Sequence, residues 1–276
     1  MRIKLHRSMM EWIFAKTSDP MTAIATFGAR VSNVARKVPT WPVYLAGMVP
    51  GAWLIWQTVF GGRYIDPVRA LETQLGLYSL QFLLASLTIT PLLRFARINM
   101  LKFRKVLGLL AFGYLTLHFL TWLFLDLQFR WGQIGADLVK RPYITVGFVA
   151  LLILVPLAAT SWQGAIRKMG AQTWARLHRL VYIAVLLGAV HFIMQEKVWT
   201  LQSIIYLIIA ILLVGIRLAW IRRCLRVTRY RRACNFRHKN DLDTATFLPY
   251  HSSRRGRMSP PPRPVHKKIS CVVTCF

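Results

Sequence analysis

Long apolar runs separated by short basic segments dominate the hydrophobic pattern of this chain. Six runs contain no Asp, Glu, Lys or Arg and are as long, or nearly as long, as a helix that crosses about 30 Å of hydrocarbon. They are Val43–Phe60, Leu75–Leu93, Val106–Leu125, Tyr143–Thr160, Leu180–Met194 and Val198–Ile216. The fifth run is the shortest, and extending it back to Ala175 adds Arg176, His178 and Arg179, whose cationic side chains can reach the interface. We therefore predict an all-α fold, a six-helix transmembrane bundle in residues 42–222.

Composition and charge point to the same environment. The chain is 55% hydrophobic and 17% charged, with 37 Lys and Arg against 9 Asp and Glu, for a net charge of +28. Soluble domains average roughly 25% charged residues. Binding to nucleic acid would explain the charge but not the apolar runs. We therefore expect membrane lipids, and no nucleic acid, around this protein.

The distribution of cations between the runs predicts the orientation. The loops after the second and fourth runs are the more basic ones; they carry Arg94, Arg97, Lys102, Arg104 and Lys105, then Arg167, Lys168 and Arg176. Basic loops stay on the cytoplasmic side of a membrane. The basic ends of the chain fall on the same side, and no cleavable signal peptide precedes the first run. We predict a multi-pass protein of the bacterial inner membrane with both termini in the cytoplasm.

The two ends differ from the middle of the chain. Residues 1–41 form a basic N-terminal extension with a second plausible start at Met21. Residues 223–276 form a basic tail that becomes Pro-rich, and we expect disorder from about Arg226. All four cysteines lie in this tail, where a cytoplasmic location predicts no disulfide framework.

Three of the seven histidines fall within the predicted spans: His118, His178 and His191. An ionisable side chain at membrane depth is costly and is by default a functional hypothesis. The alternative is a neutral histidine bonded to a neighbouring helix. Zinc normally takes three protein ligands at one point, and proton relays recruit Asp or Glu. Haem fits better, because its iron accepts imidazoles from separate helices and its macrocycle needs an apolar cleft.

The spacing of these histidines limits how they can pair. His178 and His191 are 13 residues apart, which is about 20 Å and about 220° on an ideal helix, so they cannot share one iron. Depth along the helices favours His118 with His191. His178 is left for a second haem, or for a flavin or quinone. Arg176 and Arg179 either anchor the helix at the interface or clamp a haem propionate, whose carboxylate suits the guanidinium fork.

Several motifs resemble a known family. The stretch Trp174–Tyr182, followed by His191 and Phe192, resembles the fifth helix of ferric-reductase-like transmembrane domains. Four more stretches resemble one branch of them, the MsrQ (YedZ) family; they are Ser86–Leu92, Arg104–Leu109, His118–Phe119 and Lys140–Gly147. The resemblance covers about residues 40–222. The tail beyond about Arg226 resembles nothing in the family.

The resemblance implies a function. MsrQ proteins are haem-binding membrane subunits of the bacterial methionine sulfoxide reductase system. By resemblance, this chain is a b-type cytochrome with one or two haems at His118, His178 and His191, and FMN is a further cofactor. It takes electrons from quinones and delivers them to a periplasmic molybdopterin-containing methionine sulfoxide reductase subunit. The chain is then an electron-transfer subunit, and we assign it no catalytic residue.

Two alternatives belong to other classes. A ferric reductase or NADPH oxidase would append a soluble FAD- and NADPH-binding domain, but about 60 residues follow the last run, without a Gly-rich dinucleotide fingerprint. A haem-free transporter or structural membrane protein would show no b-type band in a reduced-minus-oxidised spectrum.

Overall fold

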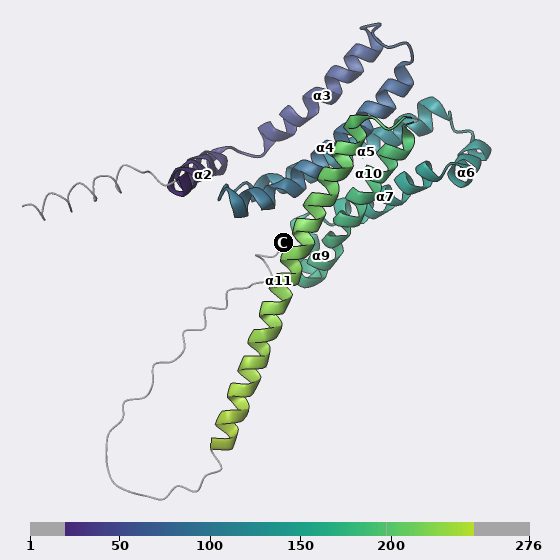
Figure 1. Ribbon diagram of the computed structural model, residues 1–276. Helices are drawn as coiled ribbons and strands as arrows, with labels where there is room; N and C mark the ends of the chain where they lie inside the picture. Colours follow the sequence, from purple (N-terminus) through teal and green to yellow (C-terminus); the bar gives the residue numbers. More distant parts are fainter. Residues whose placement is uncertain (1–19, 197, 246–276) are drawn as a thin grey trace, which may run out of the picture. The chain divides into compact units, whose positions relative to one another are not determined.

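The computed structural model describes residues 20–196 and 198–245, and every regular element in these ranges is a helix (Figure 1). The predicted all-α fold is therefore confirmed. The chain divides into two compact units, Met1–Leu213 and Val214–Phe276.

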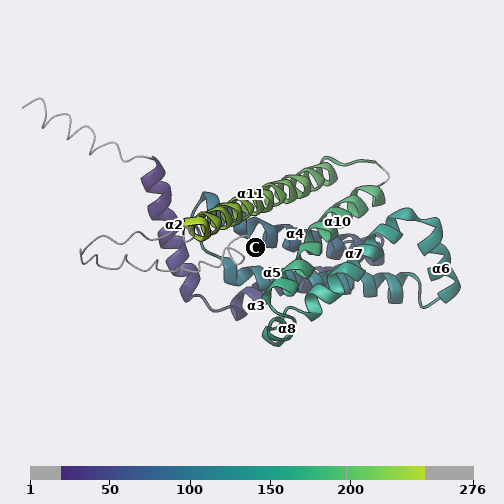
Figure 2. The ribbon, with the colours of Figure 1, turned by 90° about the horizontal axis from the view of Figure 1, so that it is seen from below.

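Four helices of the first unit form its centre: α4 (Pro67–Phe95), α5 (Leu101–Leu120), α7 (Pro142–Ala159) and α10 (Val181–Gln195). α4 packs along α5, and α7 packs along α10, while α10 also contacts α4 and α5 contacts α7 (Figure 2). A π-helix, η1 (Thr121–Asp126), extends α5, and α6 (Trp131–Lys140) leads into α7. The four central helices thus enclose a common interior.

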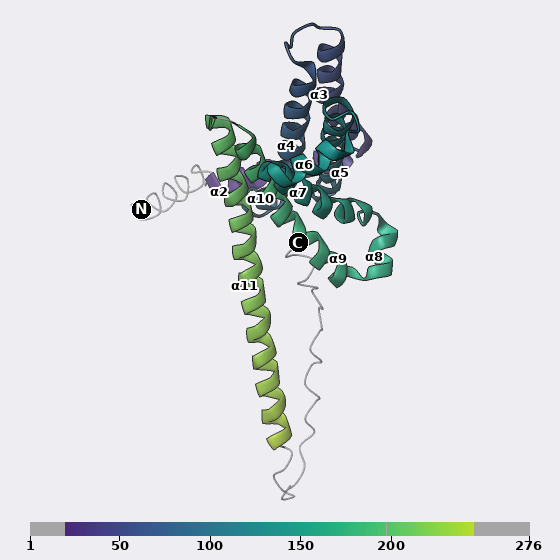
Figure 3. The same ribbon diagram turned by 90° about the vertical axis from the view of Figure 1, so that its right-hand side faces the viewer.

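The helix starts follow from local sequence. Asp66 precedes α4, and its carboxylate accepts a hydrogen bond from the Arg69 N–H at 3.1 Å, which satisfies one of the free donors at a helix start. Pro67 and Pro142 occupy the first positions of α4 and α7, where a missing N–H costs nothing. Two short helices, α8 (Gln163–Met169) and α9 (Ala171–Leu177), connect α7 to α10 (Figure 3).

Among the described residues, five helical stretches are long and apolar enough to cross a membrane: Pro67–Phe95, Leu101–Asp126, Pro142–Ala159, Ala171–Gln195 and Leu201–Arg223. They match the second to sixth predicted runs, with the fourth run extending one residue and the sixth three residues beyond its helix, so this is a multi-pass membrane protein. The first run also forms a helix, α3 (Trp41–Val59), which is not among these five. The count of six spans remains a prediction.

One tyrosine of α5 bonds to the backbone of α3 on either side of a proline within that helix. The Tyr114 hydroxyl of α5 donates to the Gly47 carbonyl at 2.7 Å and accepts from the Gly51 N–H at 2.9 Å. An uninterrupted helix would join these two backbone groups directly. Pro50 lies between them and disturbs the helix. The hydroxyl therefore satisfies backbone groups beside a proline within the helix.

The N-terminal extension is packed against the bundle. In α2 (Pro20–Lys37), the Ser32 hydroxyl accepts from the Asn99 N–H at 2.9 Å and donates to the Gly28 carbonyl at 2.6 Å. Ala35 is buried with Ile89 and Phe103. From Gly28 onward, this segment is part of the first unit rather than a separate appendage, and residues 1–19 lie outside the described residues.

The C-terminal helix is longer than expected. α11 runs over Leu201–Ala245, although we expected disorder from about Arg226. Residues 226–245 contain neither Gly nor Pro, the two residues that most disfavour a helix. The Pro-rich residues 246–276 lie outside the described residues.

Candidate functional site

A cavity of about 590 Å³ lies inside the bundle of the first unit. Its walls come from α4, α5, α7 and α10 and are mostly apolar. They include Leu80, Leu83, Leu115, Phe119, Phe148 and Leu154. Ala184 and Gly188 of α10 also line the cavity, and their small side chains leave space there. A concave, apolar cavity of this size is typical of small-molecule and cofactor sites.

Two of the three candidate histidines meet in this cavity. His118 on α5 and His191 on α10 both line it, and their ring centroids are 6.1 Å apart with an interplanar angle of 76°. The two helices are distant in sequence. The pairing therefore depends on the packing of the bundle.

Each imidazole forms a hydrogen bond with a backbone carbonyl of another helix, His118 with one on α4 and His191 with one on α7. His118 Nδ1 lies 2.8 Å from the Glu72 carbonyl oxygen of α4, and His191 Nδ1 lies 2.7 Å from the Tyr143 carbonyl oxygen of α7. A carbonyl oxygen can only accept, so each Nδ1 must carry the proton. In a neutral imidazole, Nε2 then keeps its lone pair and can bind a metal.

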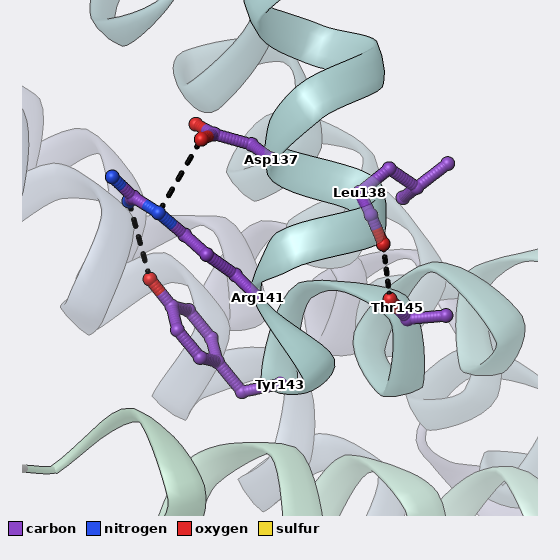
Figure 4. A network of polar contacts seen from close by, with 5 residues as sticks. All are labelled: Asp137, Leu138, Arg141, Tyr143 and Thr145. Carbon is purple, nitrogen blue, oxygen red and sulfur yellow. Dashed lines mark hydrogen bonds and ion pairs between the residues drawn. The ribbon is translucent and has the colours of Figure 1, made fainter.

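Polar residues line one part of the cavity: Asp66, Arg69, Glu72, Asp126 and Arg141. Arg141 is fixed in place, since its Nε lies 3.3 Å from the Asp137 carboxylate and one terminal nitrogen donates to the Tyr143 hydroxyl at 3.4 Å (Figure 4). The bond to Tyr143, with the nearby Asp137 charge, raises the pKa of the Arg141 guanidinium.

A further hydrogen bond connects α6 to α7 at their junction. The Thr145 hydroxyl donates to the Leu138 carbonyl at 2.5 Å (Figure 4). Together with the Arg141 contacts, it joins α6 to the first turn of α7. The same turn supplies the Tyr143 carbonyl that holds His191.

The remaining sequence candidates lie elsewhere. His178, Arg176 and Arg179 are not among the described residues that line the cavity. The His178 ring stacks on Trp174 with centroids 3.9 Å apart, and its Nδ1–H donates to the Trp174 carbonyl at 3.1 Å. Arg176 and Arg179 are exposed.

Two arginines of the cavity were missed by the sequence analysis. Arg69 and Arg141 lie at the starts of spans, on the side opposite to Arg176 and Arg179. In the sequence, the feature that could have pointed to these two arginines was their position beside the proline that begins a helix. Flanking arginines of that kind are common as interfacial anchors.

The residues present fit a haem held by two imidazoles. Metal–imidazole bonds are about 2 Å long, and each ring adds about 1 Å to its centroid, so rings on opposite sides of one iron have centroids roughly 6 Å apart. The observed separation is 6.1 Å. Within the described ranges, no group of three or more His, Cys, Asp and Glu is placed to hold a metal ion.

The matched regions define the class of protein. Residues 73–189 match the family described as "Ferric reductase like transmembrane component". This segment covers most of α4, all of α5 and α7, and most of α10, so the fold is that of a ferric-reductase-like transmembrane domain.

Curated relatives narrow the assignment. Proteins of Brucella ovis, Brucella canis and Brucella suis, each named "Protein-methionine-sulfoxide reductase heme-binding subunit MsrQ", are 44% identical to this chain over 179 residues, which is 65% of this chain and 81% of each relative. The chain belongs to the MsrQ family. No solved structure shows significant similarity to it.

Proposed function

We propose that this chain is the haem-binding membrane subunit of a methionine sulfoxide reductase system. It accepts electrons from the quinone pool and passes them to a periplasmic molybdopterin-containing subunit, which repairs oxidised envelope proteins. One observation carries the proposal: His118 and His191 line the same largely apolar cavity with ring centroids 6.1 Å apart, and the hydrogen bond at each Nδ1 leaves Nε2 with its lone pair. The names of the relatives support the same assignment.

His118 and His191 are the residues that would hold the iron. A bound haem b supplies a centre that takes up and releases one electron at a time. The carbonyls of Glu72 and Tyr143 keep each imidazole in the tautomer that can bind iron. The apolar walls exclude water, which lowers the local dielectric and affects the reduction potential.

His178 would serve a second cofactor. It lies on the 3₁₀ turn η2 (His178–Leu180) between α9 and α10, away from the cavity. A second haem, FMN or a quinone at this position would place Arg176 and Arg179 beside it. Either guanidinium could then bind a carboxylate or phosphate of that cofactor.

The proposed orientation agrees with the proposed direction of electron transfer, from the quinone pool to a periplasmic subunit. With both termini in the cytoplasm, His178 lies towards the cytoplasmic face of an inner-membrane protein. The polar part of the cavity, with Asp66 and Arg141, then lies towards the periplasm, where the partner subunit operates.

Reconstitution tests this function. The purified protein should show a b-type band in a reduced-minus-oxidised spectrum, and its absence would refute haem binding. The haem should become reduced on addition of quinol. It should be reoxidised only when the periplasmic subunit and a methionine sulfoxide substrate are both added. Acid extraction followed by flavin fluorescence tests whether FMN is bound as well.

A further inference from the structure

Both cavity histidines contact a neighbouring helix in the same local arrangement. His118 reaches the carbonyl of Glu72, and the residue four positions further along α4 is Gly76. His191 reaches the carbonyl of Tyr143, and the residue four positions further along α7 is Gly147. Each cavity histidine therefore bonds to a carbonyl at position i of a helix that has a glycine at position i+4, on two different helices.

Helix geometry explains why the glycine matters. Residues i and i+4 lie one above the other on the same face, and each Cα–Cβ bond leans towards the helix N-terminus. A side chain at i+4 would therefore cover the carbonyl at i. A carbonyl oxygen has two lone pairs, so it can accept from the imidazole in addition to its helical partner.

The space available at these positions is very small. A Cβ built on Gly76 would lie 3.2 Å from His118 Nδ1 and 3.3 Å from its Cε1. A Cβ built on Gly147 would lie 2.7 Å from His191 Nδ1 and 2.9 Å from its Cε1. An alanine at Gly76 would require a displacement of a few tenths of an ångström, and one at Gly147 a larger one. In both cases the displaced atom is the one that makes the hydrogen bond.

Gly51 of α3 has the same relation to the Gly47 carbonyl and to Tyr114, whereas Gly108, Gly113 and Gly188 do not share this feature. A Cβ on Gly108 or Gly113 of α5 would have no described atom within 4 Å outside its own helix, and one on Gly188 would meet only Leu80, at 3.8 Å. Glycine within a helix is destabilising relative to alanine. Gly76 and Gly147 therefore lie at positions where the imidazole occupies the space that a Cβ would need.

We propose that Gly76 and Gly147 are positioning residues for the two iron ligands, so this inference rests on the proposed function. The absence of a side chain lets each Nδ1–H bond to its carbonyl, which fixes the tautomer and makes Nε2 a stronger electron donor. A stronger donor stabilises the ferric state more than the ferrous state. Loss or lengthening of either bond should therefore raise the reduction potential of the haem.

The experiment compares Gly76→Ala and Gly147→Ala with Gly113→Ala in the purified full-length protein. Two quantities are measured: the electron paramagnetic resonance g-values of the low-spin ferric haem and its midpoint potential. Gly147→Ala should shift the g-values and raise the potential, Gly76→Ala should do so to a smaller extent, and Gly113→Ala should leave both unchanged. Circular dichroism should show the same helix content in all three.

The outcomes are separable. If Gly147→Ala loses its haem while Gly113→Ala retains it, the steric conflict at His191 is supported, and Gly76→Ala supplies the graded shift. Unchanged g-values and potential in both Gly76→Ala and Gly147→Ala, with haem retained, would overturn the inference while leaving the proposed function intact. Absence of low-spin haem from the wild-type protein would overturn the proposed function and this inference with it.

Discussion

His118 on α5 and His191 on α10 lie edge-on to each other, with ring centroids 6.1 Å apart and an interplanar angle of 76°, and each is oriented by a carbonyl on a helix to which neither belongs. Four helices must therefore assemble before the pair is in place. A site built on packed helices holds its ligands more rigidly than one built on loops.

Replacing either histidine of this pair should remove one haem. His118→Ala and His191→Ala each delete one of the two imidazoles, and a single remaining ligand cannot keep the iron low-spin. We expect each variant to lose one low-spin signal in optical and electron paramagnetic resonance spectra. Retention of that signal in His191→Ala would exclude the proposed pairing.

His178→Ala should behave differently. Its ring packs on Trp174 and lies outside the cavity, so the low-spin signal of the His118–His191 pair should persist. Electron uptake should slow, because His178 would serve the second cofactor. Stopped-flow reduction by quinol measures this rate. If this variant loses all haem while His191→Ala keeps it, the pairing is the other way round.

The choice between quinol and NADPH as electron donor to the haem can be tested. We expect quinol to reduce the haem in membranes and NADPH alone to leave it oxidised, because the chain has an apolar cavity but no recognisable dinucleotide-binding fingerprint. Anaerobic spectra after each addition provide the measurement. Direct reduction of the purified subunit by NADPH would favour the NADPH-oxidase alternative.

Truncation of the tail should be tolerated. Every described residue that lines the cavity precedes residue 197, and the last membrane-span candidate in the described part of the chain ends at Arg223. A protein that ends before Arg226 should keep its haem-to-protein ratio and its topology, measured by pyridine haemochrome assay and by cysteine accessibility. A lower haem ratio would show that the tail contributes to the site.

Tyr114→Phe should weaken the attachment of α3. The substitution leaves the Gly47 carbonyl and the Gly51 N–H without their shared partner, at a cost of about 1–3 kcal/mol for buried polar groups. The midpoint of thermal unfolding in detergent should fall. Tyr78→Phe on α4 is the matched control, because it preserves both of these bonds, and an equal loss in the two variants would contradict this role of Tyr114.

Apolar periodicity and charge were sufficient for the broad architecture. Within a bilayer, a long apolar run can satisfy its own backbone N–H and C=O groups by forming a helix, so the sequence alone predicts the all-α fold. The sequence also identifies His118, His178 and His191 as the ionisable candidates of the predicted spans. The family is also evident from short motifs such as Trp174–Tyr182. These features are local in sequence, which is why no knowledge of packing is needed.

The composition of the cavity depends on tertiary structure. Rise per residue estimates the depth of a histidine but not the direction in which its ring points, and only the packing of α5 against α10 brings His118 and His191 to the same cavity. Arg69 and Arg141, rather than Arg176 and Arg179, line that cavity because of how α4 and α7 begin. The role proposed for Gly76 and Gly147 depends on an imidazole from another helix filling the space beside each glycine. A contact between two helices cannot be recognised from the sequence of either helix alone.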